Sequence, residues 1–223
     1  FVRDGHCADK VFLVTRSVGE DRTEDGLTLF LVDREQPGIS VERTIMVDSR
    51  NAAHIRCEIL RLGMDAVVGE IGNAWPVLDA VLDRGRVALA AEMMGLALEA
   101  FERTVAYLKE REQFGAKIGS FQALQHRAAI MQADIELCRS VLLQALTAVD
   151  ETPEQLPMLA SLAKTRLNEL VLLVTNEAVQ MHGGIGVTDE LDIGFFLKRA
   201  RVAIQVFGDS GFHRDRYATL CGY

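Results

Sequence analysis

The second half of this chain carries two long stripes of apolar residues that recur at spacings of three and four positions. The first stripe consists of Phe121, Leu124, Ala128, Met131, Ile135, Cys138, Leu142, Ala145 and Val149. The second stripe consists of Leu156, Ala160, Ala163, Leu167, Leu170, Val174, Ala178 and Met181. Such spacing places apolar side chains on one face of a helix, and that face has to pack against other helices. Thr152 and Pro153 predict a break between two antiparallel helices, since proline cannot continue a helix.

Two further segments have a helical pattern. Residues 74–111 are apolar on more than one face, with one stripe through Leu78, Leu82, Leu89, Met93 and Leu96. We expect this helix at the centre of a bundle or at a subunit interface. A last helical region covers 192–220 and breaks near 207–211. Four such helices predict an up-down four-helix bundle over 74–223.

The chain before residue 74 has a different pattern. Short β-type runs cover 10–18, 27–33, 39–47 and 54–62, and polar turn segments separate them, the first at 20–26. This pattern predicts antiparallel sheet. A segment of about 70 residues is small for an independent β domain, so 1–73 is expected to be the C-terminal part of a larger middle β domain. The expected fold class is α+β, with a partial antiparallel barrel or sandwich segment followed by the helical bundle.

The composition disfavours several functional classes. The net charge of −8, from 24 basic and 32 acidic residues, disfavours non-specific nucleic-acid binding, which needs clustered Lys and Arg. No run approaches the roughly 18 consecutive apolar residues of a membrane span. The four cysteines are far apart without a CxxC pair, so we expect reduced thiols and no metal site in a cytoplasmic protein. Because the chain starts at Phe1 without an initiator Met, we expect that it begins inside a longer gene product.

The segment 111–122 lies between two predicted helices and has two interpretations. In the structural one, Gly115 ends the first helix and Ser120 caps the next. In the functional one, the planar guanidinium of Arg111 binds a pyrophosphate beside a helix start, where an anion is favoured.

The segment 180–190 has a similar pair of interpretations. Its three glycines, Gly183, Gly184 and Gly186, either cap a helix end or let a ligand approach free backbone N–H groups. Taken alone, His182 is expected to be a hydrogen-bonded structural residue and not a ligand or a base.

Together these segments resemble two motifs of the acyl-CoA dehydrogenase family. The pattern Arg-x-Gln-Phe-Gly-x-x-Ile-x-x-Phe-Gln covers 111–122, and Gln-x-x-Gly-Gly-x-Gly follows at 180–186. Residues 4–9 resemble the family's strand entry into its middle β domain, and residues 83–88 resemble the first turns of its central C-terminal helix. The resemblance covers essentially the whole chain. It implies the later half of the middle β domain followed by the C-terminal four-helix bundle.

This resemblance implies FAD as the cofactor, bound in part across a dimer interface. The residues that would contact it, by similarity, are Arg111, Gln113, Phe114, Phe121, Gln122, Gln180, Met181, Gly183, Gly184, Ser210 and Phe212. The resemblance also implies an acyl-CoA substrate and an electron-transfer flavoprotein or another acceptor, such as oxygen. The expected assembly is a homodimer, a homotetramer or a heteromer with a second dehydrogenase subunit.

The implied reaction oxidises the Cα–Cβ bond of an acyl-CoA thioester to the trans-2-enoyl-CoA. A carboxylate removes the α proton while hydride leaves the β carbon for the flavin. Members of the family carry this Glu either just before the last helix or on the central helix before an Arg. The corresponding residues here are Gly208 and Gly85, so both usual base positions are empty.

Three alternatives follow from the empty positions. Asp209, one residue beyond the first, serves as the base, while Arg86 orients the CoA side or the active-site turn. Alternatively, a partner subunit supplies the base. In the third, the chain is a non-catalytic helical-bundle subunit that assembles with and stabilises a catalytic partner. Glu92 is a further carboxylate, about two turns along the helix from Arg86.

Overall fold

The structure is a computed structural model that describes residues 1–21 and 23–223. It divides into two compact units, Phe1–Val81 and Leu82–Tyr223, which are described separately below. Arg22, within the turn predicted at 20–26, lies outside the described residues.

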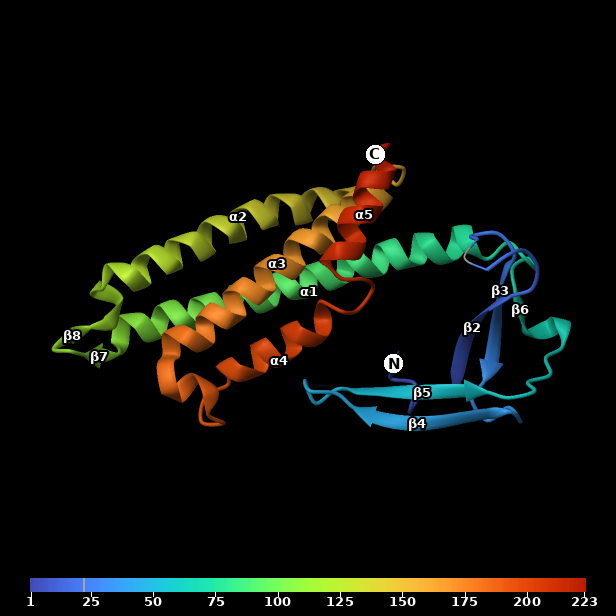
Figure 1. Ribbon diagram of the computed structural model, residues 1–223, viewed down its shortest axis with the longest axis horizontal. Coiled ribbons are helices and arrows are strands. Elements are labelled where there is room, and N and C mark those ends of the chain that lie inside the picture. Colours follow the sequence, from blue (N-terminus) through green and yellow to red (C-terminus); the bar gives the residue numbers. More distant parts are fainter. Residues whose placement is uncertain (22) are drawn as a thin grey trace. The chain divides into compact units, whose positions relative to one another are not determined.

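The first unit is built on two antiparallel three-stranded sheets, with the strand orders β1-β5-β4 and β2-β3-β6 (Figure 1). The strands are β1 (Val2–Arg3), β2 (Lys10–Arg16), β3 (Leu27–Asp33), β4 (Ile39–Ile45), β5 (Asn51–Cys57) and β6 (Val67–Val68), with a short helical turn, η1 (Met64–Ala66), before β6. β2 and β3 pair along their whole length, from Lys10 opposite Asp33 to Arg16 opposite Leu27. The predicted antiparallel sheet is therefore confirmed.

The last β-type run is shifted from its predicted bounds of 54–62. A tight turn precedes it, in which Ser49 has φ 63° and the N–H of Met46 donates to the carbonyl of Arg50 at 2.9 Å. This turn brings Asn51 directly opposite Ile45, so β5 starts earlier than predicted. Its pairing with β4 ends at Cys57, and residues 58–62 leave the sheet.

The second unit is helical, with a short hairpin after its first helix (Figure 1). Its elements are α1 (Trp75–Glu110, which begins within the first unit), β7 (Glu112–Gln113), β8 (Ala116–Lys117), η2 (Ile118–Ser120), α2 (Gln122–Asp150), α3 (Leu156–His182), η3 (Gly183–Val187), α4 (Ile193–Ala203) and α5 (Ser210–Leu220). The long helices α1, α2 and α3 alternate in direction along the bundle, while α4 and α5 pack against α3 (Figure 1). The predicted α+β class and helical bundle are confirmed, and the last helical region is divided into α4 and α5.

α3 is the most enclosed helix of the bundle. Its predicted stripe is fully buried at Ala160, Ala163, Leu167, Leu170, Val174 and Ala178. We expected residues 74–111 to occupy the centre of the bundle or a subunit interface. α1 keeps an exposed stripe that includes Arg84, Gly95 and Glu102, which contradicts the central position, while the subunit interface stays a prediction. The central position therefore belongs to α3, because its buried face extends almost around the helix and includes polar side chains such as Lys164.

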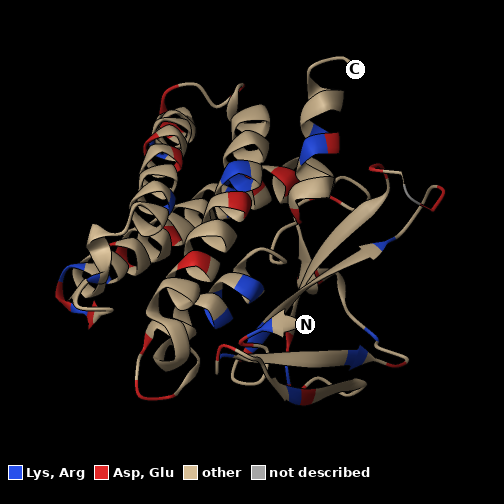
Figure 2. Ribbon diagram, turned by 60° about the vertical axis from the view of Figure 1, so that its left-hand side comes forward, with Lys and Arg blue, Asp and Glu red and all other residues tan. Residues whose placement is uncertain are grey.

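Charged residues of both signs are interspersed along the helices and strands (Figure 2). Within the described residues, no helix is both long enough and apolar enough to cross a membrane. The four cysteines are free thiols, with Cys138 in the helical core and Cys7, Cys57 and Cys221 exposed.

Candidate functional site

The first predicted cofactor segment forms a β-hairpin where α1 leads into α2. Gln113 pairs with Ala116, and Phe114 and Gly115 make the turn between them with φ 55° and 75°. Two consecutive positive φ values are typical of a type I′ turn. The prediction that Gly115 ends a helix is therefore wrong, since α1 has already ended at Glu110.

The prediction that Ser120 caps the second helix is also wrong. Its hydroxyl donates to the carbonyl of Lys117 at 2.7 Å, within the turn η2. Phe121 occupies the N-cap position of α2 and makes no side-chain capping bond. Because both parts of the structural interpretation fail, the residues of this segment have to be explained in another way.

The hairpin holds an aromatic ring out toward solvent. Phe114 is 94% exposed, and its left-handed backbone costs a bulky residue on the order of 1–3 kcal/mol. Its ring meets the edge of Phe121 at a centroid distance of 6.3 Å. Arg111 is exposed, and within the described part of the chain its guanidinium has no hydrogen-bond or ion-pair partner. A strained exposed ring beside an available guanidinium suits a flat, anionic ligand.

The second segment caps the end of α3, as its structural interpretation predicted. Gly183 is the C-cap residue with φ 65°. Gly186 is buried, and the packing requires glycine there because a Cβ would lie 2.6 Å from the carbonyl oxygen of Val179. Gly184 is different. It has no positive φ, and a Cβ built on it meets nothing within 4 Å. The fold of this chain does not require glycine at Gly184, whereas the close approach of a ligand would.

Both segments lie at the same end of the bundle (Figure 1). The hydroxyl of Tyr107 in α1 donates to the carbonyl of His182 at the end of α3, at 3.3 Å, and the two rings stack with centroids 4.4 Å apart. The ring of His182 also bonds the carbonyl of Ala178 through Nδ1 at 2.7 Å, so the expected structural role of His182 is confirmed. These contacts fix the end of α3 against the end of α1, next to the hairpin.

The remaining predicted cofactor residues of this region have different surroundings. Gln122 and Gln180 are exposed, as is the amide of Gln113, whose Nε2 donates to the carbonyl of Glu112 at 2.8 Å. Met181 is 4% exposed and packs in the core, so its side chain does not share this surface, in contrast to its predicted lining role. The exposed donors, the ring and the open glycine are groups of the kind that can bind the pyrophosphate and adenosine portions of FAD, and the buried side chain of Met181 is not among them.

The linker 204–209 between α4 and α5 contains one of the two empty base positions. Gly208 has φ 110°, and a Cβ there would lie 2.5 Å from Cδ1 of Phe212 and 2.9 Å from Nε2 of His213. A Cβ on Gly85 would lie 3.2 Å from the ring of Phe207. Neither glycine therefore has room for a glutamate side chain without movement of its neighbours.

Asp209, the base in the first of the three alternatives, has a structural role as a helix cap. It is the N-cap residue of α5, and its Oδ1 accepts a hydrogen bond from the backbone N–H of Phe212 at 2.9 Å. Its carboxylate is exposed. The two other predicted residues of this region follow it directly, with Ser210 starting α5 and Phe212 half exposed.

Arg86 lies behind the start of α5. The residue is 5% exposed, and its guanidinium donates to Oδ1 of Asp83 at 2.7 Å and lies 5.8 Å from the centroid of the Phe212 ring. Arg216 of α5 also binds Asp83 with both terminal nitrogens, at 2.8 and 2.9 Å. Of the two roles expected for Arg86, this geometry supports contact with the turn at α5.

Two buried titratable residues near this turn were not predicted. Lys164 donates to the carbonyl of Gly208 at 3.1 Å, and burial lowers its pKa to about 8. His213 contacts the carbonyl of Phe207 through Nε2 at 2.9 Å, and burial lowers its pKa to about 4. A signal for Lys164 was present in the sequence, because it lies four residues after Ala160 and three before Leu167 within the apolar stripe.

Glu92, the other carboxylate considered on α1, has a structural partner. Its Oε1 accepts from Nε of Arg199 in α4 at 2.7 Å. The Arg199 side chain is 9% exposed, so this ion pair helps to join α1 and α4.

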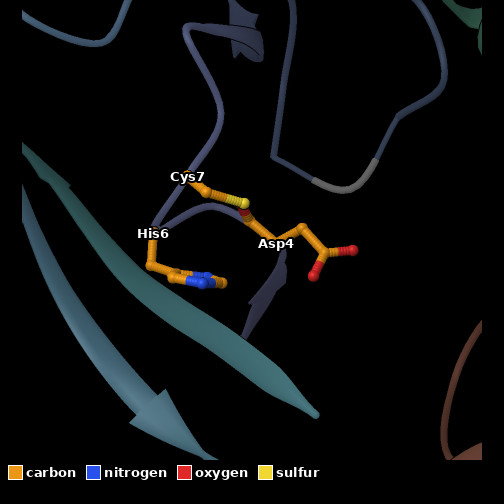
Figure 3. A group of neighbouring side chains, drawn as sticks. All are labelled: Asp4, His6 and Cys7. Carbon is orange, nitrogen blue, oxygen red and sulfur yellow. The ribbon is translucent and has the colours of Figure 1, made fainter.

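Asp4, His6 and Cys7 lie together on the turn after β1 (Figure 3). One potential ligand atom from each lies within 4.8 Å of the other two. The grouping arises because Asp4 has φ 54° and the N–H of Cys7 bonds back to its carbonyl at 3.0 Å. The turn offers three ligands, fewer than the four of a closed structural zinc site, and we assign no metal to it.

Comparison with known proteins identifies the family of this chain. The model of the C-terminal domain of acyl-CoA dehydrogenases matches residues 72–219. The mitochondrial short/branched chain specific acyl-CoA dehydrogenase of Rattus norvegicus is 30% identical over 212 residues, which are 94% of this chain and 49% of that protein. An acyl-CoA dehydrogenase structure from Geobacillus kaustophilus has a TM-score of 0.93 at 24% identity, covering 99% of this chain and 59% of that chain. A steroid ACAD named Tcur3481-Tcur3483 has a TM-score of 0.81 at 33% identity, covering 96% of this chain and 55% of that chain.

The chain spans about half the length of the curated relatives it matches. The matched region nevertheless contains the hairpin, the glycine segment and the linker before α5. The fold, the two motifs and the family model agree, and the chain belongs to the acyl-CoA dehydrogenase family.

Proposed function

We propose that this chain is part of an FAD-dependent acyl-CoA dehydrogenase that oxidises the Cα–Cβ bond of an acyl-CoA thioester to the trans-2-enoyl-CoA. The observation that supports this most is the pairing of the two cofactor segments at one end of the bundle. There, the exposed Phe114 ring, the Arg111 guanidinium and the open Gly184 have no explanation in the packing of the chain itself. Bound FAD would accept the hydride from the β carbon.

The residues of this chain would mainly bind and orient the cofactor. Arg111 and Gln113 supply donors for the pyrophosphate, because guanidinium and amide groups form strong bonds to phosphate oxygens. Phe114 supplies a flat apolar surface for the adenosine portion, with Phe121 and Gln122 nearby. Gln180, Gly183 and Gly184 would contact the adenine end. We expect these contacts to reach the FAD of a neighbouring subunit in a dimer or a tetramer of dimers.

For the α proton we propose Asp209 as the base, since it is the carboxylate next to the position where the family carries one. Its carboxylate is exposed and also caps α5. Arg86 would hold the turn through its contact with Phe212. In Asp209→Asn the side-chain oxygen still caps the helix, so the free energy of unfolding should fall by well under about 1 kcal/mol. Flavin reduction by acyl-CoA should fall by about two to four orders of magnitude.

A near wild-type rate of reduction in Asp209→Asn would place the base in a partner subunit. The second candidate function then gains weight, in which the chain is a non-catalytic bundle subunit that stabilises a catalytic partner. The packing of Gly85 and Gly208, which would admit a glutamate only if neighbouring residues moved, favours that alternative. Turnover of full-length protein alone, and with a neighbouring dehydrogenase subunit, separates the two candidates.

The cofactor assignment has its own test in the full-length protein. Arg111→Ala should weaken FAD retention, because a charge-assisted bond to phosphate contributes about 1.5–3 kcal/mol. Arg139→Ala is the matched control, since Arg139 is also partly exposed and pairs with Glu136 on α2, outside both motifs. Flavin content is measured by absorbance after dialysis. Equal flavin content in both variants would contradict the role of Arg111.

The electron acceptor is proposed from the family, as an electron-transfer flavoprotein or oxygen. Stopped-flow reoxidation of the substrate-reduced protein with each acceptor in turn would distinguish them.

A further inference from the structure

The linker before α5 is anchored at three consecutive residues. The carbonyl of Phe207 contacts Nε2 of His213 at 2.9 Å, and the carbonyl of Gly208 accepts from Nζ of Lys164 at 3.1 Å. The carboxylate of Asp209 then accepts from the backbone N–H of Phe212 at 2.9 Å. Lys164 also reaches the last residue of α4, with Nζ 3.2 Å from the carbonyl of Ala203. One ammonium group therefore binds both ends of the linker.

The backbone between these anchors is strained. Phe207 has φ 61° and Gly208 has φ 110°, and such backbone persists where the surrounding structure over-determines it. Lys164 is one of two buried groups, with His213, that can supply this constraint. It is 0% exposed, and its ammonium lies within hydrogen-bond distance of the carbonyls of Ala203, Ile204 and Gly208 and of Oδ1 of Asn168. A cation buried in this way is strongly destabilising unless all of its donors are used.

The strained linker determines where an aromatic ring lies. The Phe207 ring is the group that a Cβ on Gly85 would meet at 3.2 Å. Phe212, just after the linker, lies under the guanidinium of Arg86. The linker therefore fixes the surroundings of both positions, Gly85 and Gly208, at which the family carries its base.

We propose that Lys164 is a positioning residue for the reaction, which holds the linker 204–209 in its strained form and thereby seats Phe207 and Asp209 at the reacting end of the acyl group. This proposal rests on the proposed function. Lys164 does not touch substrate; it acts through the carbonyls of Ala203 and Gly208. Without its ammonium, these carbonyls would lose their donor and the linker would be free to relax.

The electrostatic surroundings of Lys164 are mixed. The negative charge of Asp209 raises its pKa, while burial, the larger effect, and the positive charge of Arg86 lower it. His213 packs beside the same linker and is kept neutral, since burial and the charges of Lys164, Arg86 and Arg216 lower its pKa to about 4. With a pKa of about 8, Lys164 is mostly protonated at neutral pH, so its ammonium keeps the donors that bind the linker carbonyls and Asn168.

The test uses full-length protein with FAD and the best substrate from a panel of straight-chain, branched and ring-bearing acyl-CoAs. In Lys164→Met the donors are lost while the apolar stem is kept. We expect the kcat for flavin reduction to fall about ten-fold or more, since a hydrogen bond to a charged donor is removed. The KM and the FAD content should change by less than kcat. Amide hydrogen exchange at residues 205–208 should also accelerate about ten-fold or more.

Thr175→Val is the matched control, because Thr175 is also fully buried in α3 and its hydroxyl bonds the carbonyl of Val171 at 2.6 Å, away from the linker. It should leave kcat and the exchange of 205–208 unchanged. Lys164→Gln retains a shorter neutral donor and should recover part of the kcat that is lost in Lys164→Met.

An unchanged kcat in a folded Lys164→Met protein would overturn the proposal, as would faster exchange spread over the whole bundle. If neither Lys164 variant folds, Lys164 is a folding residue and the positioning role is refuted. If wild-type protein neither retains FAD nor oxidises any acyl-CoA, the proposed function fails instead. The hydrogen-exchange comparison would still show in that case whether Lys164 holds the linker.

Discussion

Replacing each of the two glycines at the empty base positions by alanine should have different effects on stability, with a loss at Gly208 alone. Gly85 lies in α1 with ordinary helical backbone, whereas Gly208 has φ 110°. For Gly208→Ala, the left-handed backbone costs about 1–2 kcal/mol. The new Cβ would lie 2.5 Å from Phe212 and 2.9 Å from His213, and such overpacking costs a further ~1–3 kcal/mol. Together, Gly208→Ala should lower the free energy of unfolding by about 2–5 kcal/mol.

Gly85→Ala should be neutral or stabilising. Alanine is favoured over glycine inside a helix by about 0.8–1 kcal/mol. The opposing contact is with the Phe207 ring, 3.2 Å from the new Cβ, and this ring is 37% exposed and can move by a few tenths of an ångström. Gly95→Ala is the matched control, since Gly95 lies in the same helix and a Cβ there meets nothing within 4 Å. It should show the helix gain alone.

The assay is urea unfolding of the full-length protein, with the double variant Gly85→Ala/Phe207→Ala closing a double-mutant cycle. Without the Phe207 ring, Gly85→Ala should raise the free energy of unfolding by more than it does in the wild-type background. The difference is the coupling energy, expected to be about 0.5 kcal/mol or more. A Gly208→Ala protein within about 0.5 kcal/mol of wild type would refute the reasoning, because the linker would then be free to relax. A coupling energy of zero would refute the contact between Gly85 and Phe207.

Three further predictions follow from the buried polar groups. The folded-state pKa of His213 is lowered to about 4, so the unfolded state binds the proton first and stability should fall as pH drops from about 6.5 to about 4, by up to ~3 kcal/mol. His213→Gln should flatten this part of the stability–pH profile, and an unchanged profile would contradict the assignment. Asp83→Asn should lower the free energy of unfolding by about 3–5 kcal/mol in urea denaturation, because it leaves Arg86 and Arg216 buried without their carboxylate; a loss below about 1 kcal/mol would show that water solvates the pair. Burial raises the pKa of Cys138 to about 11, so in the folded protein iodoacetamide should alkylate Cys7, Cys57 and Cys221 well before Cys138, as followed by mass spectrometry.

The sequence alone was sufficient for the helices and for the family. The apolar stripe from Phe121 to Val149 and the one from Leu156 to Met181 predicted α2 and α3 to within one residue at each end. Helical periodicity is a local property that requires only one buried face, so it can be identified without knowledge of the neighbouring helices. The two cofactor motifs were visible for a similar reason, because each is a continuous run of residues.

The tertiary structure decided which buried groups meet. Lys164 lies more than 40 positions before Phe207 and Gly208 in the sequence. The packing of α3 against α4 and α5 brings these residues together. In one of the two interpretations of segment 111–122, Gly115 ended a helix. A glycine with positive φ suits a helix end and a type I′ turn equally, so the residue type does not distinguish them. Likewise, Asp209 is one carboxylate among many in the sequence, and only the folded chain shows that it follows a linker with two positive φ values. The φ of a linker residue and the burial of a lysine depend on contacts between distant segments, and local sequence patterns do not specify such contacts.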